Sequence, residues 1–148
     1  MAARRTVAFQ VDGLPAAQGS KTVGLTDDGR AFVRETSRAL APWRLAIGLA
    51  AREAMNGTDP LTGPLLLVAT FRFPRPKAHY RTGRNAGMLK PTAPELCATR
   101  PDLDKLLRAL GDAISGIVCF DDAQICELEV AKIYGSPGVH VAVSELAP

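Results

Sequence analysis

The sequence is poor in cysteine, and the three cysteines that it has form no recognisable framework. Cys97, Cys119 and Cys126 are odd in number and include no C-x-x-C pair. This pattern argues against a disulfide-stabilised fold and against a structural zinc site. Reduced thiols, and with them a cytoplasmic location, are therefore expected.

Long apolar runs are also lacking. The longest are too short to cross a bilayer, and Arg4 and Arg5 lead into an alternating segment rather than the apolar core of a signal peptide. No membrane association is expected. A nucleotide cofactor is not expected either, because Ser20 separates Gly19 from Lys21 and breaks the spacing of a phosphate-binding P-loop. Lys21 remains a candidate contact to a phosphate from a loop.

The chain has 148 residues, of which 47% are hydrophobic and 22% charged, as in an ordinary globular domain. One domain of the α+β class is predicted over residues 1–148, with a mixed β-sheet packed against two main helices. The apolar periodicities predict strands at residues 6–11, 22–26, 31–34, 65–73, 117–120, 125–134 and 139–146, and helices at residues 37–56 and from 103 until Gly116 ends the second.

The turns and helix ends are predicted from residue types that favour them. Thr36 or Ser37 is expected to cap the first helix, and Asn56 followed by Gly57 to end it. Two hairpins are expected, one around residues 27–30 and one at residues 135–138 joining the last two strands.

Positive charge is concentrated in one part of the chain. Residues 72–108 carry nine of the 18 lysines and arginines against three acids, whereas residues 109–148 carry one lysine against six acids. Within this region the proline-rich residues 74–101 are predicted to form a long functional loop. A polyanion such as DNA is the expected partner. The candidate phosphate contacts, besides Lys21, are Arg75, Lys77, Arg81, Arg84, Lys90 and Arg100.

Five aspartates lie within 21 residues, at positions 102, 104, 112, 121 and 122. Carboxylate oxygens are the ligands that Mg²⁺ and Mn²⁺ prefer. A single aspartate here would most simply cap a helix, but capping does not explain Asp112 in the last turn, where an acid opposes the helix dipole. The cluster therefore predicts a divalent metal site. Arg108, one turn beyond Asp104, is placed to meet charge that develops on a phosphoryl group.

These residues resemble the RusA family of Holliday-junction resolvases, which is common in bacteria and their phages. The resemblance rests on Pro101-Asp102-Leu103-Asp104, on the base at position 108, on Asp112-Ala113-Ile114 and on Asp121-Asp122-Ala123-Gln124-Ile125. It implies a RusA-like fold and a homodimeric endonuclease. Such an enzyme requires Mg²⁺ or Mn²⁺ and makes paired symmetric nicks in a four-way DNA junction, in a bacterial or phage-infected cell.

The resemblance also implies roles for individual residues. Asp102, Asp104 and Asp122 match the essential acids of the family, with Asp121 a further metal ligand and Asp112 and Lys105 possible supporting residues. The family usually has asparagine where Lys105 stands and lysine where Arg108 stands. Arginine keeps the charge but not the geometry of an ammonium group.

Two alternatives remain open from the sequence. One is a junction-binding recombination protein with weak or lost catalysis, because Arg108 replaces lysine. The other is an unrelated metal-binding domain with a regulatory role. The dimer surface is also open, since residues 37–56, 125–134 and 139–146 all offer apolar side chains.

Overall fold

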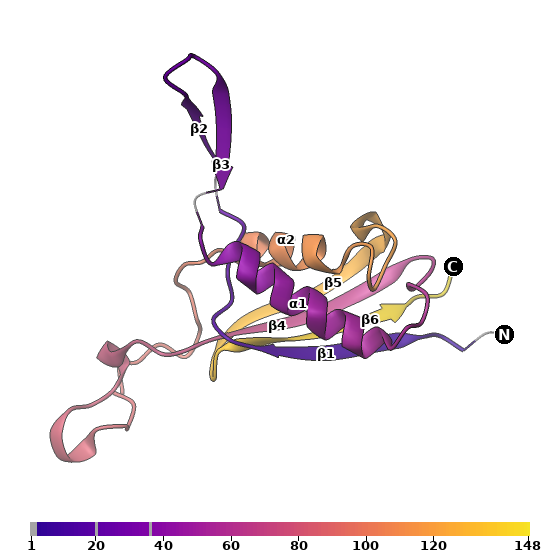
Figure 1. Ribbon diagram of the computed structural model, residues 1–148. Coiled ribbons are helices and arrows are strands. Elements are labelled where there is room, and N and C mark those ends of the chain that lie inside the picture. Colours follow the sequence, from indigo (N-terminus) through magenta and orange to yellow (C-terminus); the bar gives the residue numbers. More distant parts are fainter. Residues whose placement is uncertain (1–2, 20, 36) are drawn as a thin grey trace.

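The computed structural model describes residues 3–19, 21–35 and 37–148, and it contains a four-stranded sheet with both α-helices on one face (Figure 1). The strands follow the order β1-β6-β4-β5. Their bounds are β1 Thr6–Asp12, β4 Leu65–Phe73, β5 Ile125–Tyr134 and β6 Gly138–Glu145, and the helices are α1 Leu40–Met55 and α2 Leu103–Ile114. The predicted α+β fold with a mixed sheet and two main helices is confirmed.

The central strand β4 organises the hydrophobic core. Its alternate residues, from Leu65 to Phe73, are buried under the helices. The inner faces of α1 and α2 pack against them, so that Ile47, Leu106 and Leu110 have no exposed surface. Burying a large apolar side chain contributes roughly 1.5–3 kcal/mol. The α2 helix is thus held firmly against the sheet along its inner face.

The predicted hairpin at residues 135–138 is wrong. β6 pairs antiparallel with both β1 and β4, whereas β5 pairs parallel with the other side of β4. The turn at residues 135–138 therefore crosses over the end of β4. The local turn signal was correct, but the apolar β4 takes the central position, where both of its edges are hydrogen-bonded.

Two smaller predictions also differ from the structure. Residues 117–120 form no strand, because Cys119 makes only isolated bridges to Leu61 and Ser115. The helix predicted from residue 37 begins at Leu40, with Ala39 as a cap that uses no side chain, so Ser37 is not its cap. Thr36 lies outside the described residues. Asn56 ends α1 in the left-handed conformation, with φ 49°, as predicted.

Two segments project from the body (Figure 1). The first is a hairpin of β2 Lys21–Leu25 and β3 Ala31–Glu35, which was predicted and which we call the arm. The second is the long loop at residues 74–101, also as predicted. The loop contains two short 3₁₀ turns, η1 Lys77–His79 and η2 Gly83–Asn85, and a bridge between Tyr80 and Leu89. In the described ranges, neither helix has the length and apolar character needed to cross a membrane.

Candidate functional site

The helix α2 presents polar side chains along its outer face. Asp104, Arg108 and Gly111 are spaced i, i+4 and i+7, which places them on one side of the helix. Asp104 and Arg108 are exposed, and neither forms an ion pair with another residue of the described segments. Both charged groups are therefore available to a ligand or substrate.

Asp102 occupies the N-cap position of α2, but its side chain does not cap the helix. Its backbone is extended, with φ −71° and ψ 140°, and its carboxylate makes no hydrogen bond to the first turn. Instead Oδ2 lies 3.1 Å from Nζ of Lys105. Helix capping therefore does not account for this acid, and Lys105 is its immediate counter-ion.

The side chain of Asp121 caps a short helix. Its Oδ1 accepts a hydrogen bond from the backbone N–H of Ala123 at 2.8 Å and so caps the 3₁₀ helix η3, Asp122–Gln124. Gln124 completes a reciprocal capping box through its own side chain. The side-chain Nε2 of Gln124 also donates to the carbonyls of Leu61 and Gly63, at 3.2 and 3.1 Å. This network holds the turn of Asp121 and Asp122 in place.

Asp122 is directed at the outer face of α2. A Cβ added at Gly111 would stand 3.4 Å from Oδ2 of Asp122, so the absence of a side chain at Gly111 lets the acid approach the helix. Shielding by neighbouring atoms, a hydrogen bond with Asp121 and the charges of Asp121 and Asp112 raise the pKa of Asp122. Burial, followed by the charges of Asp122 and Asp121, also raises the pKa of the Cys119 thiol. Asp112, Asp121 and Cys119 thus lie within electrostatic reach of Asp122.

The acids predicted from the sequence fall into two groups, one near each end of α2. Asp112, Asp121 and Asp122 lie near the C-terminal half of the helix, whereas Asp102 and Asp104 lie at its start. Gly111 follows Asp104 by seven positions, which corresponds to about 10 Å along the axis. Over the described residues, no three His, Cys, Asp or Glu side chains are gathered closely enough to hold a metal ion by themselves.

Lys132 is a residue that sequence reasoning did not select. It lies on β5 in register with the buried Phe71 of β4. Its Nζ donates hydrogen bonds to the backbone carbonyls of Thr99 and of Pro101, the latter at 2.8 Å. The strand thereby holds the chain that leads directly into Asp102. A lone lysine in an alternating strand was the only signal, and its partners are more than 30 residues away.

A polar hollow of 390 Å³ adjoins the start of α2. It is lined by Ala17, Gly19, Arg100, Pro101, Asp102 and Lys105. The backbone N–H of Gln18 donates to the carbonyl of Lys105 at 3.2 Å, which ties the segment before the arm to α2. The predicted contact residue Arg100 thus lies beside the acids, together with Lys105.

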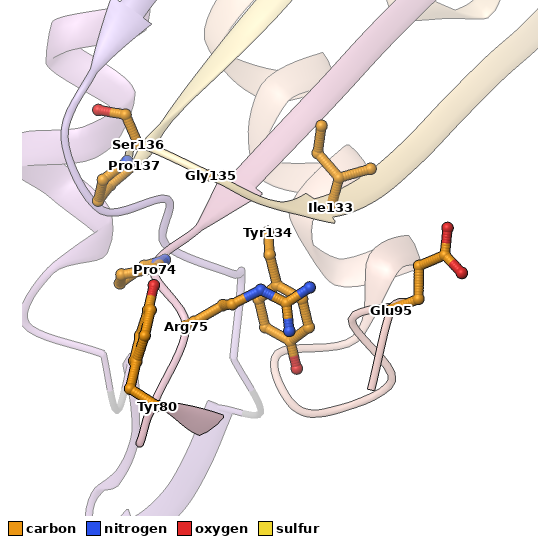
Figure 2. Close-up of a pocket in the computed structure, with 9 residues that line it drawn as sticks. All are labelled: Pro74, Arg75, Tyr80, Glu95, Ile133, Tyr134, Gly135, Ser136 and Pro137. Carbon is orange, nitrogen blue, oxygen red and sulfur yellow. The ribbon is translucent and has the colours of Figure 1, made fainter. Parts of the chain in front are cut away.

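The basic loop is anchored to the end of the sheet through Arg75. The guanidinium group lies 4.5 Å from the centre of the Tyr134 ring (Figure 2), and Nη1 donates to the carbonyl of Pro94 at 2.6 Å. His79 packs edge-on against the same ring, with 5.4 Å between centroids. Next to them lies a hollow of 550 Å³ lined by Pro74, Arg75, Tyr80, Glu95, Ile133, Tyr134, Gly135, Ser136 and Pro137.

The other predicted phosphate contacts lie further along the loop. Lys77, Arg84 and Lys90 are exposed, and Arg81 is partly exposed. Backbone bonds from Arg81 to Met88 and from Lys90 to His79, both 2.8 Å, hold the two sides of the loop together. The loop is thus an ordered support for basic side chains. The side chain of Lys21 lies outside the described part of the chain.

Comparisons with known proteins agree with the resemblance in the sequence. The family model described as "Endodeoxyribonuclease RusA" matches residues 13–144. The chain is also 27% identical, over 147 residues, to "Uncharacterized protein YqaN" of Bacillus subtilis (strain 168), in an alignment that covers 95% of this chain and 97% of that protein. Since the family match spans most of the chain, and with it both groups of acids, the chain belongs to the RusA family of endodeoxyribonucleases.

Proposed function

We propose that this RusA-family endodeoxyribonuclease depends on a divalent metal and resolves four-way DNA junctions by paired symmetric nicks. The observation that carries the proposal is the approach of Asp122 to the face of α2 that displays Asp104 and Arg108. In this proposal α2 and the turn at η3 supply acids and a base to the same side of the protein.

The donor set fits Mg²⁺ or Mn²⁺. All the candidate ligands are carboxylates, and the pKa of Asp122 is raised first by shielding from water and then by its hydrogen bond with Asp121 and the charges of Asp121 and Asp112. Magnesium takes only one or two carboxylates together with water and substrate phosphates, so a site of three clustered side chains is not required. The candidate ligands are Asp102 and Asp104 at the start of α2 and Asp122 near its other end, with Asp121 as a further candidate and Asp112 in support, and one ion would take one or two of these carboxylates.

A bound divalent ion would polarise the phosphodiester and lower the pKa of an attacking water. The other catalytic and binding roles would be filled by side chains of this protein. Arg108 is exposed on α2 between the two groups of acids, where its guanidinium group can stabilise charge on the phosphoryl oxygens. Lys105 pairs with Asp102 in the free protein, and its partly exposed side chain would be free to contact a DNA phosphate once a cation binds the acid.

The basic loop and its surroundings would hold the DNA. Lys77, Arg81, Arg84 and Lys90 extend from the body of the protein, and Arg100 lies beside Asp102. Contacts to phosphates fix the position of DNA without reading its sequence. The role of Arg75 combines DNA contact with support, because its side chain already anchors the loop to Tyr134.

Paired nicks require two active sites. A four-way junction has approximate two-fold symmetry, and a homodimer presents one acidic surface to each of two related phosphates. One chain carries one such surface. The enzyme is therefore proposed to act as a homodimer on branched DNA.

The test is cleavage of a synthetic four-way junction in Mg²⁺ by the wild-type protein and by Asp102→Asn, Asp104→Asn and Asp122→Asn. Each substitution should reduce nicking at least about 100-fold, since a catalytic metal contributes several kcal/mol. Junction binding should persist because the phosphate contacts remain. The matched control is Asp59→Asn, which changes an exposed acid that is distant from α2 in the sequence.

The outcomes separate the candidate functions. Wild-type nicking rates in all three variants would contradict the proposed site. Tight junction binding by the wild-type protein with no nicking in Mg²⁺ or Mn²⁺ would favour the junction-binding function in which Arg108 has weakened catalysis. A lack of preference for junctions over linear duplex would contradict both functions.

A further inference from the structure

The arm carries an apolar face that no other described residue covers. In the β2–β3 pairing Val23 lies opposite Val33 and Leu25 opposite Ala31, so these side chains share one face of the hairpin. Val23, Leu25 and Val33 are 73%, 72% and 63% exposed. A two-stranded hairpin is at best marginally stable alone in water. An apolar face on such an element indicates a surface that is covered in an assembly.

The opposite face of the arm is partly filled by its own Phe32, which is 39% exposed. The ring of Phe32 lies directly over Gly24, in the space that a Cβ at Gly24 would occupy. This leaves the face with Val23, Leu25 and Val33 as the surface to be covered. The turn that joins β2 to β3 contains Asp27 and Asp28. Arg30 pairs with Asp28 at 3.3 Å, whereas Asp27 makes no salt bridge within the described residues.

A second uncovered apolar surface lies on α1. The inner side of the helix is buried through Trp43 and Ile47, whereas Leu45 and Leu49, one turn apart, are 63% and 59% exposed. Arg52 follows Leu49 by three residues on the same side. Residues 38–53 contain three arginines and one acid, a balance of +2. This surface is therefore an apolar stripe with positive charge around it.

We propose that the arm of one chain packs its apolar face on α1 of a second copy, and that the arm of the second copy packs in the same way on α1 of the first. The two surfaces match in character, because both are aliphatic and the acidic turn of the arm complements the basic surroundings of α1. They also match in size: a five-residue strand is about 17 Å long, and a helix of 16 residues is about 24 Å long. A reciprocal exchange buries two such contacts, as a two-fold dimer requires.

The acidic turn argues against DNA as the occupant of the arm. Phosphates would be repelled by Asp27 at the tip of the arm, and of the candidate phosphate contacts only Lys21 belongs to the arm, whereas the loop at residues 74–101 that carries most of them projects from a different part of the body (Figure 1). The inference rests on the proposed homodimeric enzyme and specifies the surface through which the two copies associate.

The first experiment measures the dimer dissociation constant of the full-length protein by sedimentation equilibrium. The arm variant Val23→Thr/Leu25→Thr/Val33→Thr keeps β-forming residues, and the helix variant Leu45→Gln/Leu49→Gln keeps helix-forming ones. Each should raise the constant at least about tenfold, since each removes several buried apolar contacts. Leu128→Thr, at a residue that is 53% exposed on β5, is the control and should leave the constant unchanged.

The second experiment tests whether the arm and α1 are partners. Mixing the arm variant with the helix variant should give a heterodimer, because one intact arm meets one intact α1, while each variant alone stays largely monomeric. Native mass spectrometry distinguishes the species. Failure of the mixture to associate would overturn the pairing, and circular dichroism confirms that both variants remain folded.

Other outcomes would overturn the inference in separate ways. A monomeric wild-type protein, or arm variants that remain dimeric, would contradict it. Arm variants that stay dimeric but lose junction affinity would assign the arm to DNA. If the wild-type protein nicks junctions while the arm variants stay dimeric, only this inference fails. If the variants dissociate as expected but the wild-type protein does not nick, only the proposed function fails.

Discussion

The carboxylate of Asp122 lies against Gly111 in the third turn of α2, where an added Cβ would stand 3.4 Å from Oδ2. This contact joins the second acidic motif to the helix that begins with the first. Gly111 is therefore the residue of α2 against which the carboxylate of Asp122 is positioned.

Gly111→Ala should reduce nicking while the protein stays folded. The new methyl group would stand 3.4 Å from Oδ2 of Asp122, so the carboxylate must give way by at most a few tenths of an ångström, whereas alanine improves the helix by up to about 1 kcal/mol. Nicking rates and thermal unfolding should be measured together. Gly48→Ala in α1 is the matched control, since its Cβ would meet Ile117 Cδ1 at an ordinary 3.6 Å. Equal nicking by both variants would show that the position of Asp122 is not critical.

Lys132→Met should slow nicking at least about tenfold, because about 1.4 kcal/mol of lost transition-state stabilisation has that effect. The substitution removes the hydrogen bonds to Thr99 and Pro101 that hold the chain before Asp102. Junction affinity should change little, since the basic loop is intact. Lys132→Arg should recover part of the rate by restoring donors. A single-turnover nicking assay separates these effects, and a large loss of junction affinity would indicate a direct DNA contact instead.

Neutralising Lys77, Arg84 and Lys90 together, each by glutamine, should weaken junction binding and flatten its salt dependence. Each phosphate contact that is lost should lower the slope of log affinity against log salt by roughly one unit. These three side chains are exposed, whereas Arg75 is held by Tyr134 and Pro94. Fluorescence anisotropy at several salt concentrations measures the slope. An unchanged slope would place the DNA on another surface.

Gly138→Ala should destabilise the protein by about 1–3 kcal/mol, the usual cost of forcing extra atoms into a packed site. Its Cβ would lie 2.6 Å from the carbonyl oxygen of Val11 and 2.8 Å from Nη2 of Arg72. Gly135→Ala is the control, because its Cβ would meet only the flexible side chain of Arg72, at 3.4 Å. Urea denaturation compares the two, and equal midpoints would contradict the close approach of β6 to β1 at this residue.

Glu145→Gln should lower stability at neutral pH but not in acid. The backbone N–H groups of Thr62 and Arg5 donate to the carboxylate and lower its pKa. For an acid with a lowered folded pKa, the stabilisation is full above the ordinary value of 4.5 and is lost as the pH falls through the folded pKa. Thermal unfolding from about pH 7 to about pH 3 should therefore show the two proteins converging, and a difference that persists at about pH 3 would contradict the role of the charged carboxylate.

Elements with a local signal could be predicted from the sequence alone. The apolar run of β4, the stripe of leucines on α2 and the turn residues of the arm each depend on neighbours a few positions away. The same holds for the basic loop and for the placement of Asp102 and Asp104 at the start of a helix, because residue type and spacing are enough to predict both.

Which of these elements meet depends on tertiary packing. The turn at residues 135–138 has the residues of a hairpin, yet β4 separates the two strands because the most apolar strand gains most from the centre of the sheet. The contact of Asp122 with Gly111 and the anchoring of Pro101 by Lys132 join residues 11 and 31 positions apart. No local pattern encodes such pairs, since they arise from how the sheet and α2 pack together.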